Sequence, residues 1–283
     1  AQQDAQFSQN MFNKLANNPG FTGSNQAISV IGLYRDQWSG FEDAPQTTNL
    51  SVHAPISALR GGIGLSVFSD HEGEYDNTNI NLSYAYQAEL GGGQLGIGLS
   101  FGMYQSGLDG SGFNPSEVGD NTIPTSEVTG SALDLGAGIY FNTQDVYFGL
   151  SSLHLNEPDI NVSDGSIKQL RQHYFLIAGS YHELSSRLSI NPSIYLKSVG
   201  STTQLDINTN LIYNDKIWGG LSYRLDEGIV VLAGLELMKD LRLGLAYDIV
   251  MNELTNSFEV MLGYNFDIKV DTQIKRYKNP RFL

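Results

Sequence analysis

The side chains that most often carry out chemistry in proteins are scattered in this sequence. No two histidines show the spacing of a metal-binding motif such as HExxH, and no GxSxG sequence marks a nucleophilic serine. The chain has no cysteine, which excludes a disulfide framework, a thiolate nucleophile and a Cys-ligated zinc ion. We therefore expect no enzyme, no cofactor and no metal centre. We expect no such role for any of the five histidines, which are His53, His71, His154, His173 and His182.

Acidic residues between predicted strands are the remaining candidates for ion binding. Loop carboxylates together with loop carbonyls can hold calcium, but the spacing here matches no defined calcium loop. Solvated surface charge is the interpretation that we favour. The residues concerned are Asp109, Glu117, Asp120, Asp159 and Asp164.

Composition excludes several classes of protein. The chain has 283 residues, with 30 acidic against 16 basic residues and a net charge of −14. Nucleic acid is therefore not expected as a partner, because phosphate binding needs a basic surface. Mean hydropathy is −0.19, and no apolar run approaches the roughly 18 residues of a membrane helix. These values do not exclude a membrane β-barrel, since the lumen side of such a barrel is polar.

Apolar and small or polar residues alternate with a period of two from about residue 27 to residue 267. Residues 241–249 are typical: Leu245 and Tyr247 occupy one phase, and Gly244 and Asp248 occupy the other. Because successive strand side chains point to opposite faces, each segment has one apolar face. We predict about fourteen strands, at 27–36, 47–56, 61–69, 78–90, 94–105, 131–141, 145–154, 171–183, 187–198, 202–213, 216–225, 229–238, 241–250 and 257–267.

The apolar face is predicted to point outward, to lipid. The opposite phase is rich in Gly, Ser, Asn and Asp, which would fill a soluble core poorly but suit a wetted or plugged lumen. Most of the strands run about ten residues, the length that a tilted strand needs to cross a bilayer. Aromatic residues share the apolar phase, as in the interface girdles of membrane barrels, and include Tyr84, Phe101, Phe175, Tyr181 and Tyr223.

The connections support the same prediction. Every second turn is tight, as at 91–93, 142–144 and 214–215, whereas those between are often longer, as at 106–130 and 155–170. Outer-membrane barrels have short periplasmic turns and longer extracellular loops. The predicted fold is all-β: a transmembrane antiparallel up-and-down barrel of about 14 strands in the outer membrane of a Gram-negative bacterium, with both termini periplasmic.

Two terminal regions do not fit a plain barrel. Phe7, Met11, Phe12 and Leu15 lie about one helical turn apart and predict a short amphipathic helix that buries its apolar side in the lumen or at its periplasmic mouth. The last residues are rich in Lys and Arg and extend past the last predicted strand, which already suffices to close a barrel. The predicted organisation is an N-terminal plug or periplasmic segment at 1–26, an outer-membrane barrel at 27–267 and a basic periplasmic tail at 268–283.

Several motifs occur in an order that resembles the PorP/SprF family of type IX secretion system outer-membrane proteins, found in Bacteroidetes. These are QFSQNMFN at 6–13, NPGFTGS at 18–24, YRDQWSGFEDAP at 34–45, NLSVHAPI at 49–56 and the terminal KNPRFL. The resemblance covers the whole chain. Departures are mild: Ala5 and Lys14 stand where prolines are common, and Gly20 where alanine is.

The resemblance implies a non-enzymatic barrel for secretion and cell-surface anchoring, including gliding motility adhesins. Its implied partners are the C-terminal domain of a large secreted adhesin, other type IX components of the translocon or periplasmic ring, and outer-membrane lipid. The positions carried over as partner-binding or plug residues are Gln6, Phe7, Ser8, Gln9, Met11, Phe12, Asn13, Arg35, Gln37, Trp38, Gly40, Phe41 and Pro45. Periplasmic docking is assigned to Lys278, Pro280, Arg281 and Phe282.

Two alternatives stay open at this point. The two motifs around these positions either contact a partner or only plug and brace the barrel, with Arg35 paired inside to an acid such as Asp134 or Asp206. An outer-membrane channel for hydrophobic or small solutes, like the fatty-acid channels, also fits about fourteen strands with an N-terminal plug.

Overall fold

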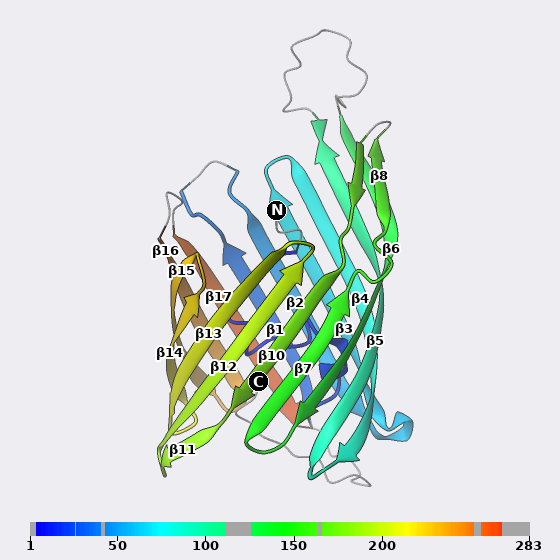
Figure 1. Ribbon diagram of the computed structural model, residues 1–283. Helices are drawn as coiled ribbons and strands as arrows, with labels where there is room; N and C mark the ends of the chain where they lie inside the picture. Colours follow the sequence, from blue (N-terminus) through cyan, green and yellow to red (C-terminus); the bar gives the residue numbers. More distant parts are fainter. Residues whose placement is uncertain are drawn as a thin grey trace.

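The structure is a closed antiparallel β-barrel (Figure 1). The computed structural model describes residues 4–25, 27–40, 43–110, 126–163, 166–251 and 256–267. The first and last strands close the ring, from the pair Ala27↔Asp267 to the pair Asp36↔Phe258. Within the described residues, no helix is long and apolar enough to cross a membrane.

Fourteen strands make up the wall. β10 (His173–Ser180) and β11 (His182–Ser185) both pair with β12, so they form one strand interrupted at Tyr181. The other wall strands are β1 (Ala27–Asp36), β2 (Gln46–Ile56), β3 (Gly61–Glu72), β4 (Tyr75–Leu90), β5 (Gly93–Asp109), β6 (Glu127–Asn142), β7 (Val146–Leu153), β12 (Leu188–Val199), β13 (Thr202–Tyr213), β14 (Ile217–Arg224), β15 (Gly228–Met238), β16 (Leu241–Val250) and β17 (Ser257–Asp267).

The predicted barrel is confirmed, and one hairpin was missed. β8 (Asp159–Ser163) and β9 (Ser166–Gln169) pair within the region expected to be a loop at 155–170. β8 packs against β6, which begins at Glu127 rather than at the predicted residue 131. Buried apolar side chains of β5, of β8 and of the residue after β9 fix this contact, and they are Tyr104, Leu108, Ile160, Val162 and Leu170.

The two faces of the wall have the predicted polarity. Leu82, Leu99 and Phe101 are 61%, 67% and 56% exposed on the outer face, where a bilayer would cover them. Polar side chains such as Asn49 and Asp206 are fully buried on the inner face. The apolar face therefore points outward, as a barrel in lipid requires.

Phe175 and Tyr181 correct one part of that prediction. Both were expected on the outer face, yet they are 3% and 4% exposed and belong to an apolar cluster inside the lumen. Leu15 and Phe21 of the N-terminal segment lie in the same cluster. The lumen wall is aromatic here because the segment that fills it presents apolar side chains that need apolar partners.

The N-terminal segment fills the lumen, but the predicted amphipathic helix is wrong. Its described residues form turns, with a short 3-10 helix η1 (Pro19–Phe21); a second, η2 (Ser57–Leu59), follows β2. Barrel side chains replace helical hydrogen bonds, since the backbone amides of Ser8 and Gln9 donate to the Glu259 carboxylate. Asn18 caps η1 by accepting a hydrogen bond from the Gly20 amide at 2.8 Å.

One end of the barrel carries short connections, whereas the longer connections, together with short turns at 73–74 and 200–201, lie at the other end (Figure 1). Gly91 and Gly92 join β4 to β5 with φ angles of 56° and 84°. Asn214 and Asp215 take φ angles of 52° and 56° after β13. The Gly91–Gly92 pair is typical of the two-residue hairpin turns that match strand twist, whereas three residues connect β13 to β14. The first loop, after β1, and the β8–β9 hairpin lie at the other end, which we call the long-loop end.

Candidate functional site

A network of buried charges joins the N-terminal segment to the barrel wall. Glu259 on β17 accepts hydrogen bonds from the backbone amides of Ser8, at 2.7 Å, and Gln9, at 2.9 Å. The Ser8 hydroxyl donates to Asp248 on β16 at 2.7 Å. Charge-assisted hydrogen bonds of this kind are about twice as strong as neutral ones, so they fix the segment in one position.

Arg35 is paired inside the barrel, but not to the acids that were expected. Its guanidinium lies 2.7 Å from Asp248 and 3.5 Å from Glu259 and donates to the Ser8 hydroxyl at 3.0 Å. The expected partners, Asp134 and Asp206, make other contacts. The strand register explains the difference, because closure of the barrel places Arg35 directly opposite Glu259.

Arg224 on β14 extends the network across the lumen. It pairs with Asp206, its cross-strand neighbour, at 3.3 Å and with Asp248 at 3.0 Å. It also donates to the Ser8 hydroxyl at 3.2 Å. Asp248 and Ser8 therefore lie between two arginines, and each of the three buried carboxylates has an arginine partner, as burial of charge requires.

Apolar side chains complete the attachment of the segment. Phe7, Met11 and Phe12 are buried in one cluster, where the ring centroids of Phe12 and Trp218 are 5.4 Å apart. Burying each such side chain contributes about 1.5–3 kcal/mol. The Asn13 side chain donates to Asn49 of β2. These predicted positions thus all contact the barrel wall from inside.

Lys14 is the one basic residue of the described N-terminal segment. Its ammonium donates to the Met11 carbonyl oxygen at 2.6 Å and lies 4.8 Å from the centre of the Tyr147 ring. Burial lowers the pKa of Lys14 to about 7. The segment therefore carries a group whose charge changes near neutral pH.

A cavity of about 430 Å³ opens above the network at the long-loop end. The predicted residues Gln6, Arg35, Gln37, Trp38 and Pro45 all line it. The first loop is held in place because the Gln37 amide donates to the Pro45 carbonyl oxygen and the Trp38 amide donates to the Ser257 hydroxyl. The structure thus brings together two motifs that are separate in the sequence.

Of the remaining predicted positions, those that the structure describes do not line this cavity. Gly40 is exposed at the tip of the first loop. Phe41 lies outside the described residues, as do all of the proposed docking residues of the tail, namely Lys278, Pro280, Arg281 and Phe282. Of the loop acids, Asp109 and Asp159 are exposed, while Glu117, Asp120 and Asp164 also lie outside the described residues.

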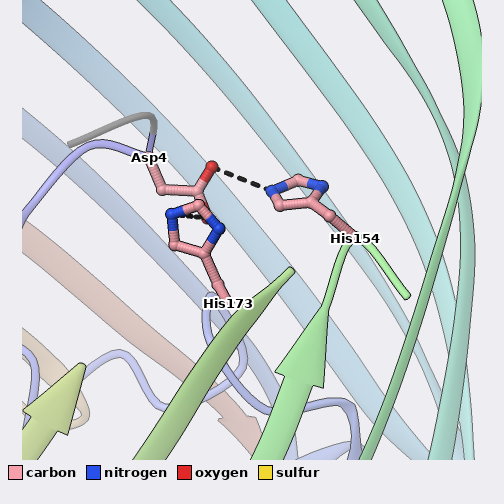
Figure 2. A group of neighbouring side chains, drawn as sticks. All are labelled: Asp4, His154 and His173. Atoms are coloured by element: carbon pink, nitrogen blue, oxygen red, sulfur yellow. Dashed lines mark hydrogen bonds and ion pairs between the residues drawn. The ribbon is translucent and has the colours of Figure 1, made fainter. Parts of the chain in front are cut away.

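One cluster was missed by the sequence reasoning. His154, just after β7, and His173, at the start of β10, lie beside Asp4 (Figure 2). Spacing along the chain does not reveal this group, because the β8–β9 hairpin separates the two histidines. The available signal was their position, since both border the predicted 155–170 loop and therefore lie at the same end of adjacent strands.

Comparison with known structures shows the same fold. The chain is similar to the monoaromatic hydrocarbon channel CymD, with 12% identity, 94% of each chain covered and a TM-score of 0.52. It is also similar to a TodX deltaS2S3 mutant hydrocarbon channel, with 14% identity, 93% of this chain and 95% of that chain covered and a TM-score of 0.50. No protein with a curated description matches the sequence.

The family indicated by the sequence motifs is confirmed. An antiparallel barrel with an apolar outer face is one of the two architectures that span a bilayer, and this chain is accordingly an outer-membrane barrel. The family model described as Type IX secretion system membrane protein PorP/SprF matches residues 1–264, and the chain belongs to that family.

Proposed function

We propose that the protein is a non-enzymatic type IX secretion component that binds the C-terminal signal domain of a large secreted adhesin and anchors the adhesin at the cell surface. Family membership supports the secretion role. The observation that carries the binding role is the combination of a filled lumen and an open cavity at the long-loop end. Such a barrel offers a binding surface more readily than a conduit.

The chemistry of the cavity indicates what would bind there. Two arginines line it, but both are already bonded to internal carboxylates. Acids nearer the mouth, Asp70, Glu72 and Glu227, add negative charge to the lining. We infer that the bound element presents polar and basic groups, and that Trp38 supplies an apolar contact at the rim.

Co-purification from the native host tests the proposal. Tagged protein should retain a large secreted partner through the C-terminal domain of that partner. Glu72→Lys reverses an exposed charge at the cavity, whereas Glu89→Lys makes the same change at the tight-turn end of β4. We expect the first variant to lose the partner and the second to retain it. Equal retention by both variants would place the contact elsewhere.

The solute channel is the second candidate, and the fold of the CymD and TodX channels favours it. Transport would require residues 5–24 to leave the lumen, against the contacts of Glu259 and of the apolar cluster. Conductance and solute uptake by the purified barrel in planar bilayers and vesicles separate the two. Robust conductance from the barrel alone would overturn the anchoring proposal.

Docking of the basic tail and periplasmic placement of the C-terminus remain part of the proposal, whereas the described start of the chain does not lie at the tight-turn end. Asp4 lies inside the lumen toward the long-loop end, so the chain enters the first strand only after crossing the barrel interior. Deletion of residues 278–283 should reduce co-purification of periplasmic ring components. It should leave adhesin binding intact, because the cavity lies at the opposite end of the barrel from Asp267, the last residue of β17.

A further inference from the structure

We propose that Asp4, His154 and His173 form a binding site for a divalent transition-metal ion, which fastens the start of the N-terminal segment to the barrel wall. The three side chains converge from the N-terminus, the end of β7 and the start of β10 (Figure 2). One donor atom from each lies within 4.8 Å of the other two. This site goes beyond the proposed anchoring function.

The distances suit a metal ion at the centre. Asp4 Oδ1 lies 2.9 Å from His154 Nε2, and Asp4 Oδ2 lies 3.8 Å from His173 Nε2. Zinc–ligand bonds of about 2.0–2.1 Å at tetrahedral angles place donor atoms about 3.3 Å apart. The two observed distances, one to each oxygen of Asp4, lie on either side of that value, so coordination would need side-chain rotations that draw the three donors together.

The outer contacts of both imidazoles fix Nε2 as the ligand atom. His173 Nδ1 donates to the Arg171 carbonyl oxygen at 2.8 Å, which leaves the Nε2 lone pair directed at the cluster. His154 Nδ1 lies 2.8 Å from Asp134 Oδ1, in the carboxylate–histidine arrangement that supports metal sites. Asp134 is itself held by Asn79, which donates to Oδ2.

The surroundings of His173 also point to a bound ion. Its side chain is fully buried, and within the described residues Nε2 has no hydrogen bond. A buried polar atom left unsatisfied costs about 1–3 kcal/mol, so such atoms normally have a partner. A metal ion would provide that partner while binding Asp4 and His154 together.

The donor set selects the class of ion. Two imidazole nitrogens and one carboxylate oxygen suit zinc and neighbouring first-row ions, whereas calcium and magnesium prefer oxygen ligands. Asp4 also lines the 430 Å³ cavity, which leaves room for water at a fourth position. Lys197 donates to the Asp4 carbonyl oxygen at 2.7 Å and so positions the residue.

Zinc titration of the full chain in detergent, after removal of metal with a chelator, tests the site. We expect one Zn²⁺ per chain by calorimetry and by elemental analysis. Asp134→Asn should weaken binding about 10–100-fold, the usual effect of losing an outer-shell partner, and His173→Gln at least as much. His71→Gln is the matched control, because His71 is exposed and pairs with Asp76.

Asp4→Ala keeps the test decisive if the histidine variants fail to fold, because residue 4 lies outside every strand. Retained heat-modifiable migration on gels would show that the barrel has formed. Cobalt substitution gives a separate readout, since its visible absorption reports coordination geometry. Loss of the zinc and cobalt signals in Asp4→Ala supports the site. Unchanged binding in that variant, or no stoichiometric binding by the parent chain, would overturn it.

Discussion

The backbone amide of Ser8 donates a 2.7 Å hydrogen bond to the carboxylate of Glu259, which joins the start of the chain to its last strand. The same carboxylate accepts from the Gln9 amide and lies 3.5 Å from the Arg35 guanidinium. Glu259 is therefore both a cross-strand partner at barrel closure and the receptor for the N-terminal segment. One side chain thus links the strand pair that closes the barrel to the segment that fills the lumen.

Glu259→Ala should release the N-terminal segment. It removes both acceptors for the Ser8 and Gln9 amides and leaves Arg35 with less compensating charge. Breaking a buried charge pair by removing one partner costs about 3–5 kcal/mol. We expect faster tryptic cleavage after Lys14 and raised conductance in planar bilayers. Glu89→Gln, at an exposed position, should change neither the cleavage nor the conductance. If the bond after Lys14 stayed resistant to trypsin in Glu259→Ala, Glu259 would not be what holds the N-terminal segment.

Gly98 on β5 should not tolerate a side chain, because the N-terminal segment passes directly over it. An added Cβ would overlap the carbonyl of Pro19. We expect Gly98→Ala to lower the free energy of unfolding by about 1–3 kcal/mol, as overpacking does. Gly107→Ala on the same strand is the control, since the atoms nearest to a Cβ added there lie 3.5 Å from it. Urea unfolding in detergent measures the stability of both variants. Equal stability would show that the N-terminal segment moves to accommodate the added methyl group.

The strands were predictable because lipid and lumen impose opposite demands on neighbouring residues. Leu99 is exposed and Ser100 is buried, and this contrast repeats along much of the barrel wall. Phe175 broke the rule because its inner position faces apolar residues of the N-terminal segment rather than water. Polarity along the strand reports its surroundings only when the composition of the lumen is known.

Contacts between distant residues were not predictable from the sequence. Arg35 was assigned an internal acid, but the choice of Glu259 and Asp248 follows from strand register and barrel closure. The amides of Ser8 and Gln9 bond to Glu259, so local periodicity overestimated helix formation. The Asp4 cluster depends on three segments that meet only in the folded barrel.

Leu99→Arg tests which face meets lipid. Leu99 lies near the middle of β5 and is 67% exposed on the outer face. An arginine at the bilayer midplane costs about 2–4 kcal/mol, whereas one near the interface costs about 0–1 kcal/mol. Leu90→Arg, at the end of β4, is therefore the matched control. We expect the larger loss for Leu99 when unfolding is measured in lipid vesicles; equal small losses would mean that this face does not meet lipid.

Lys14 should make stability depend on pH. Its pKa is lowered by burial to about 7, against 10.5 for the free side chain. Between these values the unfolded chain binds more protons than the folded chain, so the free energy of unfolding rises with pH. The gain from pH 7 to pH 10 is about 4 kcal/mol at most, at 1.36 kcal/mol per pH unit. Lys14→Met should flatten this slope and stabilise the fold at neutral pH, whereas Lys216→Met, in an exposed turn, should preserve it. Urea unfolding across the range measures each slope, and identical slopes in the parent chain and Lys14→Met would show that the buried ammonium does not control stability.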